Sequence, residues 1–498
     1  MTVDFPETIP GLLEWRAARA PAGPWLFFEG DSWTLADVAG EVESFAAGLA
    51  ERGVVQGDRV ALLLGNRPEA LFAWFAANRL GAIAAPLNHA FKAPELAALL
   101  RLIRPRVLVV GDEHRALAEA ACLETGSGAP ELVGPKALSS SGKGAPRADV
   151  GVDDVAVLIA TSGTTGSPKA VMQTHRTFTL TAEAFPAWLG LSGDDRLLAA
   201  LPLFHINAQA YSTMGALGVG AGLAILGKFS ASRFWDDARR LGATQVNVVG
   251  AMVHILLAGP ERATDREHSL RTCYAALALP EAQHRAFEER FGLAMTVGYG
   301  MSETTFGTVW PRDLAPRYGT MGRLRQHPRL GDINRARIVR DDGKDAQDGE
   351  AGELWLANPA TMSGYWDNPA ETAVALARGW LHTGDIVRRD GADFFTFVSR
   401  KKDMIRRRGE NVAAAEIENA LLAHPAVGEA AAVGVPSALG EDEIVAYVAP
   451  RAGAAIDVDA LRDWVRTKLA DFKVPTRILV RDALPRTATE RVAKHLLR

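Results

Sequence analysis

"VAVLIATSGTTGSPKAVMQTHR", residues 155–176, contains the strongest local signal in the chain. Its first six residues form an apolar run that predicts a buried strand, and the run leads directly into a turn rich in hydroxyls and glycine. Glycines let a backbone bend so that its N–H groups approach an anion, and a lysine adds positive charge. The turn therefore predicts a polyphosphate site formed by Thr161, Ser162, Gly163, Thr164, Thr165, Gly166 and Lys169.

This turn is not a Walker P-loop, because no G-x-x-x-x-G-K-[ST] pattern can be read through it. A simple Ser/Thr/Gly turn after a strand is a common alternative. Such a turn rarely combines four hydroxyls within five positions, as at 161–165, with two glycines and a lysine. The phosphate-binding interpretation is therefore favoured.

Length and composition indicate a multidomain globular chain without the charge pattern of a nucleic-acid or membrane-surface protein. The 498 residues exceed what one compact core holds, so two or more domains are expected. The 55 basic and 59 acidic residues give a net charge of −4. The only two cysteines, Cys122 and Cys273, are too few for a disulfide framework. Small buried residues and a reducing cytoplasmic location are therefore expected.

No targeting or membrane-spanning segment is expected. Residues 1–15 lack a basic region followed by an apolar run, and no window reaches ~18 uninterrupted apolar residues. The most apolar region, residues 211–227, is short and interrupted by glycines. It is typical of the buried core of a large α/β domain.

Strand-like and helix-like segments alternate through the first ~400 residues, which predicts an α/β fold with mostly parallel sheets and helices outside. Residues 58–65, 68–81 and 82–88 illustrate the pattern as strand, helix and strand. Residues 124–154 are rich in Gly, Ser and Pro, and a surface excursion is expected there.

The chain changes character near residue 400. Residues 399–412 contain eight charged residues and no hydrophobic period, which is typical of a solvated linker. Beyond them, residues 414–427 place Ile417, Ala420, Leu421 and His424 at helical spacing. Two strands, at 429–436 and 444–450, and an amphipathic helix from the N-cap Asp457 complete the pattern. A large domain, 1–401, and a small mobile α+β domain, 402–498, are predicted.

With these motifs identified, the chain resembles the adenylate-forming superfamily of acyl- and aryl-CoA synthetases, peptide-synthetase adenylation domains and luciferases. Five motifs occur in the family's order: residues 161–169, 296–305, 379–405, 406–418 and 471–498. The resemblance covers essentially the whole chain. It implies that a carboxylate attacks the α-phosphate of ATP to give an acyl-adenylate and pyrophosphate, and that a thiol then displaces AMP.

The resemblance also implies a role for individual residues. The turn at 161–169 would hold the β- and γ-phosphates, and Glu303 would help to hold Mg²⁺. The adenine, the α-phosphate and the ribose hydroxyls would be contacted by Tyr299, Thr304 and Asp385, in that order, and Arg400 would contact the ribose or a phosphate. His205 would lie between the acyl pocket and the phosphates, although a lone histidine beside apolar residues is also a common core residue.

The hinge and the small domain carry the second half-reaction in this family. The resemblance places the pivot of a domain rotation at Lys402 and the pantetheine passage beside Gly409. The arginines 406–408 would attract CoA phosphates, or would simply be solvated; the sequence leaves both open.

Two motifs depart from the family pattern. The family's terminal motif places a catalytic lysine after a glycine, whereas Glu490 and Arg491 stand here. Arg491 would fill the catalytic role with altered geometry, Lys494 would replace it, or adenylation would be weak. Near residues 273–283, relatives have a glycine-rich loop, whereas Ala276, Leu277 and Ala278 predict a bulkier, more apolar wall of the substrate pocket.

The function that follows from the resemblance is an ATP-dependent acyl-CoA synthetase that uses ATP, Mg²⁺ and CoA and acts on a small carboxylic acid. The chain is most similar to the carnitine- or crotonobetaine-CoA ligase-like subgroup. One alternative is an adenylation enzyme that loads a separate carrier-protein thiol. Another is a degenerate nucleotide-binding scaffold. No nucleic-acid partner is expected, and a homodimer is left open.

Overall fold

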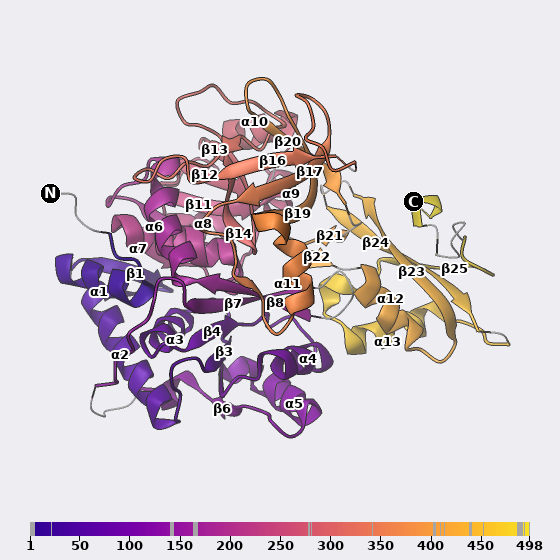
Figure 1. The fold of residues 1–498 in the computed structure, drawn as a ribbon, viewed down its shortest axis with the longest axis horizontal. Helices are drawn as coiled ribbons and strands as arrows, with labels where there is room; N and C mark the ends of the chain where they lie inside the picture. The colour runs from indigo at the N-terminus through magenta and orange to yellow at the C-terminus, as the bar shows by residue number, and fades with distance from the viewer. Residues whose placement is uncertain are drawn as a thin grey trace.

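The computed structural model describes most of the chain and shows a large lobe with a smaller lobe beside it (Figure 1). It describes residues 5–20, 22–139, 144–162, 168–276, 279, 281–340, 342–401, 405–408, 410–412, 414–437, 441–451, 453–485, 492 and 494–497. The side chains of Ser162 and Arg400 also lie outside the description.

The large lobe contains a nine-stranded sheet with a parallel centre and antiparallel edges. In spatial order its strands are β15 (Arg323–Leu324), β14 (Thr304–Val309), β13 (Ala294–Met301), β12 (Thr272–Ala276), β11 (Gln245–Val249), β9 (Arg196–Ala199), β10 (Gly222–Ile225), β1 (Pro24–Phe28) and β2 (Asp31–Thr34). Each of the central strands pairs in parallel with its neighbours among β13, β12, β11, β9, β10 and β1. The edge strands β2, β14 and β15 pair antiparallel.

A second, seven-stranded sheet carries the predicted phosphate turn. Its order is β18 (Gly364–Tyr365), β8 (Pro168–Thr174), β7 (Val155–Ser162), β4 (Ile83–Pro86), β3 (Arg59–Leu63), β5 (Val107–Val110) and β6 (Glu131–Val133). Strand β6 lies within residues 124–154, so the predicted surface excursion is partly wrong. Its backbone pairs in parallel with β5 and adds an edge strand to the sheet.

A smaller antiparallel sheet completes the large lobe. It contains β16 (Arg335–Val339), β17 (Gly352–Ala357), β19 (Leu381–Arg389) and β20 (Phe395–Arg400) in this order. The side chains of Leu354, Leu356 and Val387 form its core, and Tyr299 of β13 packs into the same cluster. This packing joins the small sheet to the nine-stranded sheet.

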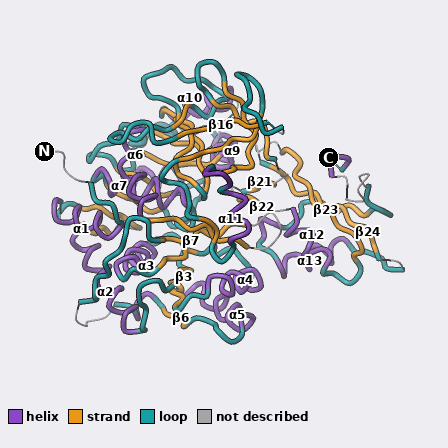
Figure 2. The backbone as a smooth tube through the Cα atoms, viewed as in Figure 1, coloured by secondary structure: helices purple, strands orange, loops and turns teal. Residues whose placement is uncertain are grey.

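Helices cover the two larger sheets on their outer faces and separate them inside (Figure 2). They are α1 (Ile9–Arg19), α2 (Leu35–Glu51), α3 (Pro68–Arg79), α4 (Ala93–Ile103), α5 (Arg115–Thr125), α6 (His175–Leu189), α7 (Met214–Val219), α8 (Phe234–Arg240), α9 (Gly250–Ala258), α10 (Glu281–Phe291) and α11 (Pro369–Ala375), with a π-helix, η3 (Asn207–Thr213). Observed βα alternation confirms the predicted α/β class of the large domain.

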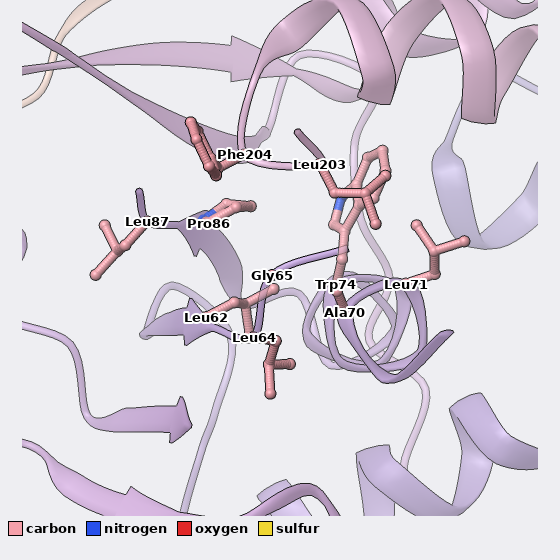
Figure 3. Close-up of a pocket in the computed structure, with 10 residues that line it drawn as sticks. All are labelled: Leu62, Leu64, Gly65, Ala70, Leu71, Trp74, Pro86, Leu87, Leu203 and Phe204. Atoms are coloured by element: carbon pink, nitrogen blue, oxygen red, sulfur yellow. The ribbon is translucent and has the colours of Figure 1, made fainter. Parts of the chain in front are cut away.

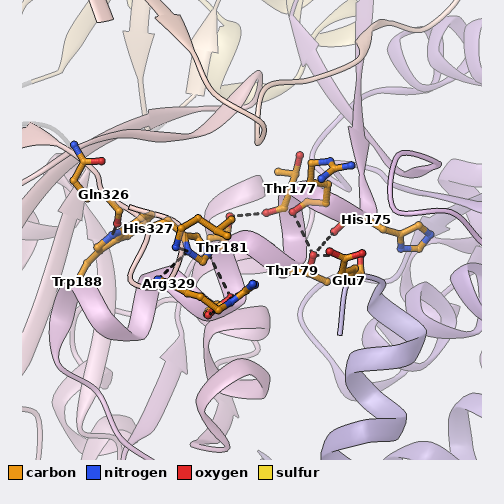
Figure 4. A network of polar contacts seen from close by, with 12 residues as sticks. Glu7, His175, Thr177, Thr179, Thr181, Trp188, Gln326, His327 and Arg329 are labelled. Carbon is orange, nitrogen blue, oxygen red and sulfur yellow. Dashed lines mark hydrogen bonds and ion pairs between the residues drawn. The ribbon is translucent and has the colours of Figure 1, made fainter. Parts of the chain in front are cut away.

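Helix α6 links the two sheets through buried threonines (Figure 4). The hydroxyls of Thr181 and Thr305 lie 2.7 Å apart, and Thr177 donates to the side-chain oxygen of Gln173 at 2.8 Å. Thr305 belongs to β14, whereas Gln173 belongs to β8. These bonds therefore fix the position of β14 relative to the strands beside the phosphate turn.

The small domain is an α+β unit, as predicted. It contains β21 (Ile405–Arg407), β22 (Glu410–Val412), α12 (Ala414–Leu422), β23 (Val427–Pro436), β24 (Asp442–Pro450), α13 (Val458–Lys468) and β25 (Arg477–Val480). Its core includes Ile417, Leu421, Leu461 and Val465. Asp457 caps α13 by accepting from the N–H groups of residues 459 and 460. The helical prediction for His424 is wrong, because α12 ends two residues earlier.

Two further sequence predictions concern buried segments. Residues 211–227 lie in the main core, where Met214, Leu217 and Leu223 are fully buried, as expected. Cys273 is buried, but Cys122 is only partly so. In the part of the chain that the structure describes, no helix has both the length and the apolar character needed to cross a bilayer.

Close helix packing predicts opposite effects of one substitution at two helical glycines. A Cβ added to Gly218 in α7 would lie far inside van der Waals contact with the carbonyl oxygen of Ala182 in α6. Gly218→Ala should therefore lower the free energy of unfolding by about 1–3 kcal/mol. Gly40 in α2 is exposed and faces open space, so Gly40→Ala should raise it by about 1 kcal/mol through helix propensity. Urea unfolding measures both, and equal effects would contradict the packing argument.

Candidate active site

The motif at residues 296–305 forms the β13–β14 hairpin, in which Met301 pairs with Thr304. Thr304 is fully buried, and its hydroxyl donates to the side-chain oxygen of Asn358 at 3.2 Å. The main-chain oxygen of Glu303 accepts from the N–H of Met362 at 2.8 Å. Contacts from residues 358–362 therefore hold the turn that carries Glu303, the predicted Mg²⁺ ligand, and Thr304, the predicted donor to the α-phosphate.

Tyr299 and Asp385 meet although they come from motifs 86 residues apart. The tyrosine hydroxyl donates to the carboxylate of Asp385 at 2.7 Å, and both side chains are buried. The N–H of Asp385 also donates to the hydroxyl of Thr383 at 3.1 Å. The predicted adenine-binding and ribose-binding residues are thus brought together where β13 and β19 approach each other.

Lys169 lies in β8, opposite Thr161 of β7, at the base of the phosphate turn. Its ammonium contacts the carboxylate of Glu371 at 2.6 Å and lies 5.0 Å from the ring centroid of Tyr365. The hydroxyl of Tyr365 donates to the carboxylate of Glu303 at 2.9 Å. Tyr365 therefore lies between the predicted phosphate-binding lysine and the predicted Mg²⁺ ligand, and the structure places both in one cluster.

Sequence reasoning missed Tyr365, Glu371 and Asn358. Burial and the charge of Glu303 raise the pKa of Tyr365, so its hydroxyl remains a donor. Glu371 had a readable signal, because Asn368, Pro369 and Glu371 form a helix-start pattern, and Asn368 does cap α11. A lone tyrosine and a lone asparagine carried no such signal.

His205 contacts the small domain. Its Nε2 lies 2.8 Å from the carboxylate of Glu410 in β22. Burial of the ring lowers the pKa of His205, but the charge and hydrogen bond of Glu410 outweigh this and raise its pKa above the ordinary value. Burial likewise raises the pKa of Glu410, but His205 lowers it below its ordinary value overall. The hydrogen bond between His205 and Glu410 therefore carries opposite charges and crosses the boundary between the domains.

An apolar cavity adjoins the segment that leads to His205 (Figure 3). Leu203 and Phe204 form one wall, and Leu62, Trp74 and Leu87 form others. The side chains that line it carry no charge.

Several predicted site residues lie outside the described residues: Gly163, Thr164, Thr165, Gly166, Leu277, Ala278, Lys402, Gly409 and Arg491. The roles given to them, and to the side chains of Ser162 and Arg400, stay predictions. Lys494 is described, and its ammonium lies 2.6 Å from Glu418 within the small domain. Arg407 donates to the main-chain oxygen of Val474, also within the small domain.

Glu303 suits the predicted Mg²⁺ role by its chemistry. Mg²⁺ prefers one or two carboxylates together with phosphate oxygens and water. Among the described residues no cluster of three or more His, Cys, Asp or Glu side chains could hold a metal by itself. A single carboxylate beside a phosphate turn therefore fits a metal that arrives with its nucleotide.

Comparisons with known proteins give the family of the chain. Residues 13–366 match the family described as AMP-binding enzyme, and residues 416–491 match the AMP-binding enzyme C-terminal domain. The chain is 32% identical over 470 residues to crotonobetaine/carnitine–CoA ligase of Escherichia coli, covering 90% of this chain and 89% of that protein. It is 34% identical over 502 residues to sulfoacetate–CoA ligase of Cupriavidus necator, covering 98% and 97%.

The chain therefore belongs to the AMP-binding enzyme family. Among solved structures it resembles o-succinylbenzoate CoA synthetase of Bacillus subtilis, with 27% identity and 98% coverage of both chains. The TM-score is 0.86 against a double mutant bound to a product analogue, OSB-NCoA, and 0.70 against the complex with ATP and a magnesium ion. The chain as a whole thus superposes better on the complex with the product analogue than on the complex with ATP and magnesium.

The contact between His205 and Glu410 predicts a measurable pKa change. In Glu410→Gln the carboxylate charge is lost while burial remains, so the pKa of His205 should fall below its ordinary value. NMR titration of the ring protons measures this pKa. Glu443→Gln, at an exposed position of β24, serves as the control and should leave it unchanged.

The same pair gives the sign of the pH dependence. Its contribution to domain contact is lost as pH rises through the raised pKa of His205, and also as pH falls through the lowered pKa of Glu410. An unchanged pKa of His205 in Glu410→Gln would show that the two side chains do not interact in solution.

Proposed function

We propose that this protein is an ATP-dependent acyl-CoA synthetase that forms an acyl-adenylate from a small carboxylic acid and transfers the acyl group to CoA. Family membership and two CoA ligase relatives support this activity. The observation that carries it is the meeting of separate nucleotide motifs, because Tyr299 bonds Asp385 while Tyr365 joins Lys169 to Glu303.

In the first half-reaction an oxygen of the carboxylate attacks the α-phosphorus of ATP, and the bond to pyrophosphate breaks. Like charges must be brought together, so catalysis depends on positioning and neutralisation. Lys169 contacts Glu371 in this structure, and its ammonium would exchange that carboxylate for the terminal phosphates. Thr304 would donate to the α-phosphate and Asp385 would accept from the ribose hydroxyls.

Magnesium, held by Glu303 and phosphate oxygens, would supply charge neutralisation on the leaving pyrophosphate. The bond from Tyr365 would keep the carboxylate of Glu303 oriented for that purpose.

In the second half-reaction the thiol of CoA attacks the acyl carbonyl, and AMP leaves. The small domain, residues 402–498, would rotate about Lys402 and bring Gly409 beside the pantetheine arm. The contact of its neighbour Glu410 with His205 supports this assignment, because it places β22 at the predicted acyl site. The higher similarity to the CoA-type complex also supports it.

The sequence left two alternatives, one for the thiol acceptor and one for the cation that assists adenylation. A separate carrier-protein thiol could replace CoA as the acceptor, since both present the same phosphopantetheine. Arg491, Lys494 or neither could assist adenylation. The cytoplasmic location and the homodimer stay predictions.

The proposal predicts which products form under each condition. A panel of carboxylic acids with ATP and Mg²⁺ should release pyrophosphate, and rapid release of AMP should require CoA. Coupled assays of pyrophosphate and AMP, with and without CoA, measure this. Asp385→Asn should lower kcat/KM at least about tenfold, because an ionised acceptor for the ribose is lost. Asp393→Asn, at an exposed turn, is the matched control.

Two results would contradict the proposed function. ATP binding without pyrophosphate release from any acid would favour a nucleotide-binding scaffold. AMP release that requires a phosphopantetheinylated carrier protein, and does not respond to CoA, would favour the carrier-loading alternative.

A further inference from the structure

Arg325 is a fully buried cation, and within the described residues its hydrogen-bond partners include no carboxylate. Its Nε donates to the main-chain oxygen of Thr308 at 2.9 Å, and one terminal nitrogen donates to the hydroxyl of Tyr211 at 2.6 Å and to the main-chain oxygen of Thr305. The other terminal nitrogen donates to the hydroxyl of Tyr274. Every one of these acceptors is neutral.

A buried charge is usually paired, because removing it from water without an opposite charge is costly. Aromatic rings reduce that cost here, since the guanidinium carbon lies 4.7 Å from the ring of Trp188 and 5.0 Å from that of Tyr211. Aromatic rings and neutral oxygens nevertheless leave a net positive charge in the protein interior. A ligand anion would compensate it.

The hydroxyl of Tyr274 has a proton that it can donate to a ligand. Burial raises the pKa of Tyr274, so this hydroxyl keeps its proton. It accepts a hydrogen bond from Arg325, and within the described ranges no acceptor for its own proton is found. A hydroxyl that accepts from a cation is a stronger donor, because the charge polarises its O–H bond.

Arg325 and Tyr274 lie against the strand that carries the nucleotide motif. A Cβ added to Gly298 would stand 2.8 Å from a terminal nitrogen of Arg325 and 2.5 Å from the hydroxyl of Tyr274. A Cβ added to Gly300 would stand 3.6 Å from the other terminal nitrogen. Gly298 and Gly300 flank Tyr299 on β13, so the cation lies directly beside the adenylate site.

A polar path connects this cation to the acyl side of His205. The π-helix η3 begins two residues after His205, and it contributes half-buried Asn207 at one end and buried Tyr211 further along. The side chain of Asn247 donates to that of Asn207 at 2.7 Å, and Asn247 is the neighbour of Tyr274 in the β11–β12 ladder. π-Helical segments are frequent at functional sites.

We infer that the acid activated by this enzyme is short and carries a second anionic group, a carboxylate or a sulfonate, which Tyr274 and Arg325 recognise where they pack against Gly298 and Gly300 of β13. The inference rests on the proposed function. The inferred site would favour the acid named for the sulfoacetate–CoA ligase over those named for the crotonobetaine/carnitine–CoA ligase. The sulfonate of sulfoacetate would be attracted by Arg325, whereas the quaternary ammonium of crotonobetaine or carnitine would be repelled.

Matched acids test the charge preference. Malonate, succinate, glutarate and sulfoacetate carry a second anionic group, the monoamides of the three dicarboxylates carry a neutral amide at the far end, and 4-(trimethylammonio)butanoate is cationic there. Pyrophosphate release should give the highest kcat/KM for one of the dianions, at least about tenfold above its own monoamide, because the buried donors are otherwise left without a charged acceptor. The cationic acid should be slowest.

Tyr274→Phe tests the residue while retaining its packing. It should lower kcat/KM about tenfold for the preferred dianion, since one charge-assisted hydrogen bond is lost, and leave the monoamide nearly unaffected. Tyr318→Phe removes a hydroxyl from a cluster with His284 and Trp310 and should keep the wild-type preference. Arg325→Lys, which keeps the charge, should retain more of the dianion preference than Arg325→Met.

Three results would overturn the inference. Wild-type enzyme could prefer a neutral or cationic acid to every dianion. Tyr274→Phe could lower activity on dianion and monoamide equally, which would show a structural role only. If no acid of any charge releases pyrophosphate, the proposed function itself fails and the inference falls with it, a result distinct from a wrong preference.

Discussion

The ammonium of Lys473 lies between two carboxylates, and the orientation of the small domain depends on this contact. Lys473 belongs to the small domain, and its nitrogen is 2.8 Å from Glu95 of α4 in the large domain and 2.7 Å from Glu416 of α12. All three side chains are largely buried. Burial lowers the pKa of Lys473, but the two carboxylates outweigh it and raise this pKa, so the cation is retained. Turning the small domain away would break the buried contact between Lys473 and Glu95, so this cluster favours the orientation seen here.

That orientation brings a second charged pair into place. With Lys473 seated against α4, Glu410 reaches His205, and the small domain meets the acyl side of the site. On the opposite side, the nucleotide motifs meet within the large domain alone, through the bonds of Tyr299 to Asp385 and of Tyr365 to Glu303. If the proposed site roles are right, the nucleotide-binding half of the site is preformed, whereas the thiol-accepting half would depend on where the small domain lies. This difference between the two halves would suit a two-step reaction in which one domain moves.

The sequence predicted those parts of the protein that depend on local pattern or on a motif read in order. Alternating apolar segments predicted β3, α3 and β4, and the motifs predicted that Tyr299, Glu303 and Asp385 belong to one site. Contacts between distant segments could not be read in this way. Arg325 looks like a surface residue in an arginine-rich stretch, and only the approach of β12 and η3 shows that it is buried. The apolar wall expected from Ala276 gave no sign of this cation, because Arg325 comes from a segment distant in the sequence.

We propose that the contact of Lys473 with Glu95 belongs to the orientation for thioester formation, and that binding of ATP moves the small domain to a different orientation. Electron–electron distance measurements test this directly, with one spin label on the partly exposed Cys122 of α5 and one on a cysteine introduced at exposed Arg477 of β25. Buried Cys273 should stay unlabelled. With CoA and AMP, we expect the distance between the two spin labels to equal the distance in this structure. With ATP and Mg²⁺, we expect a different distance. The same distribution under both conditions would contradict it.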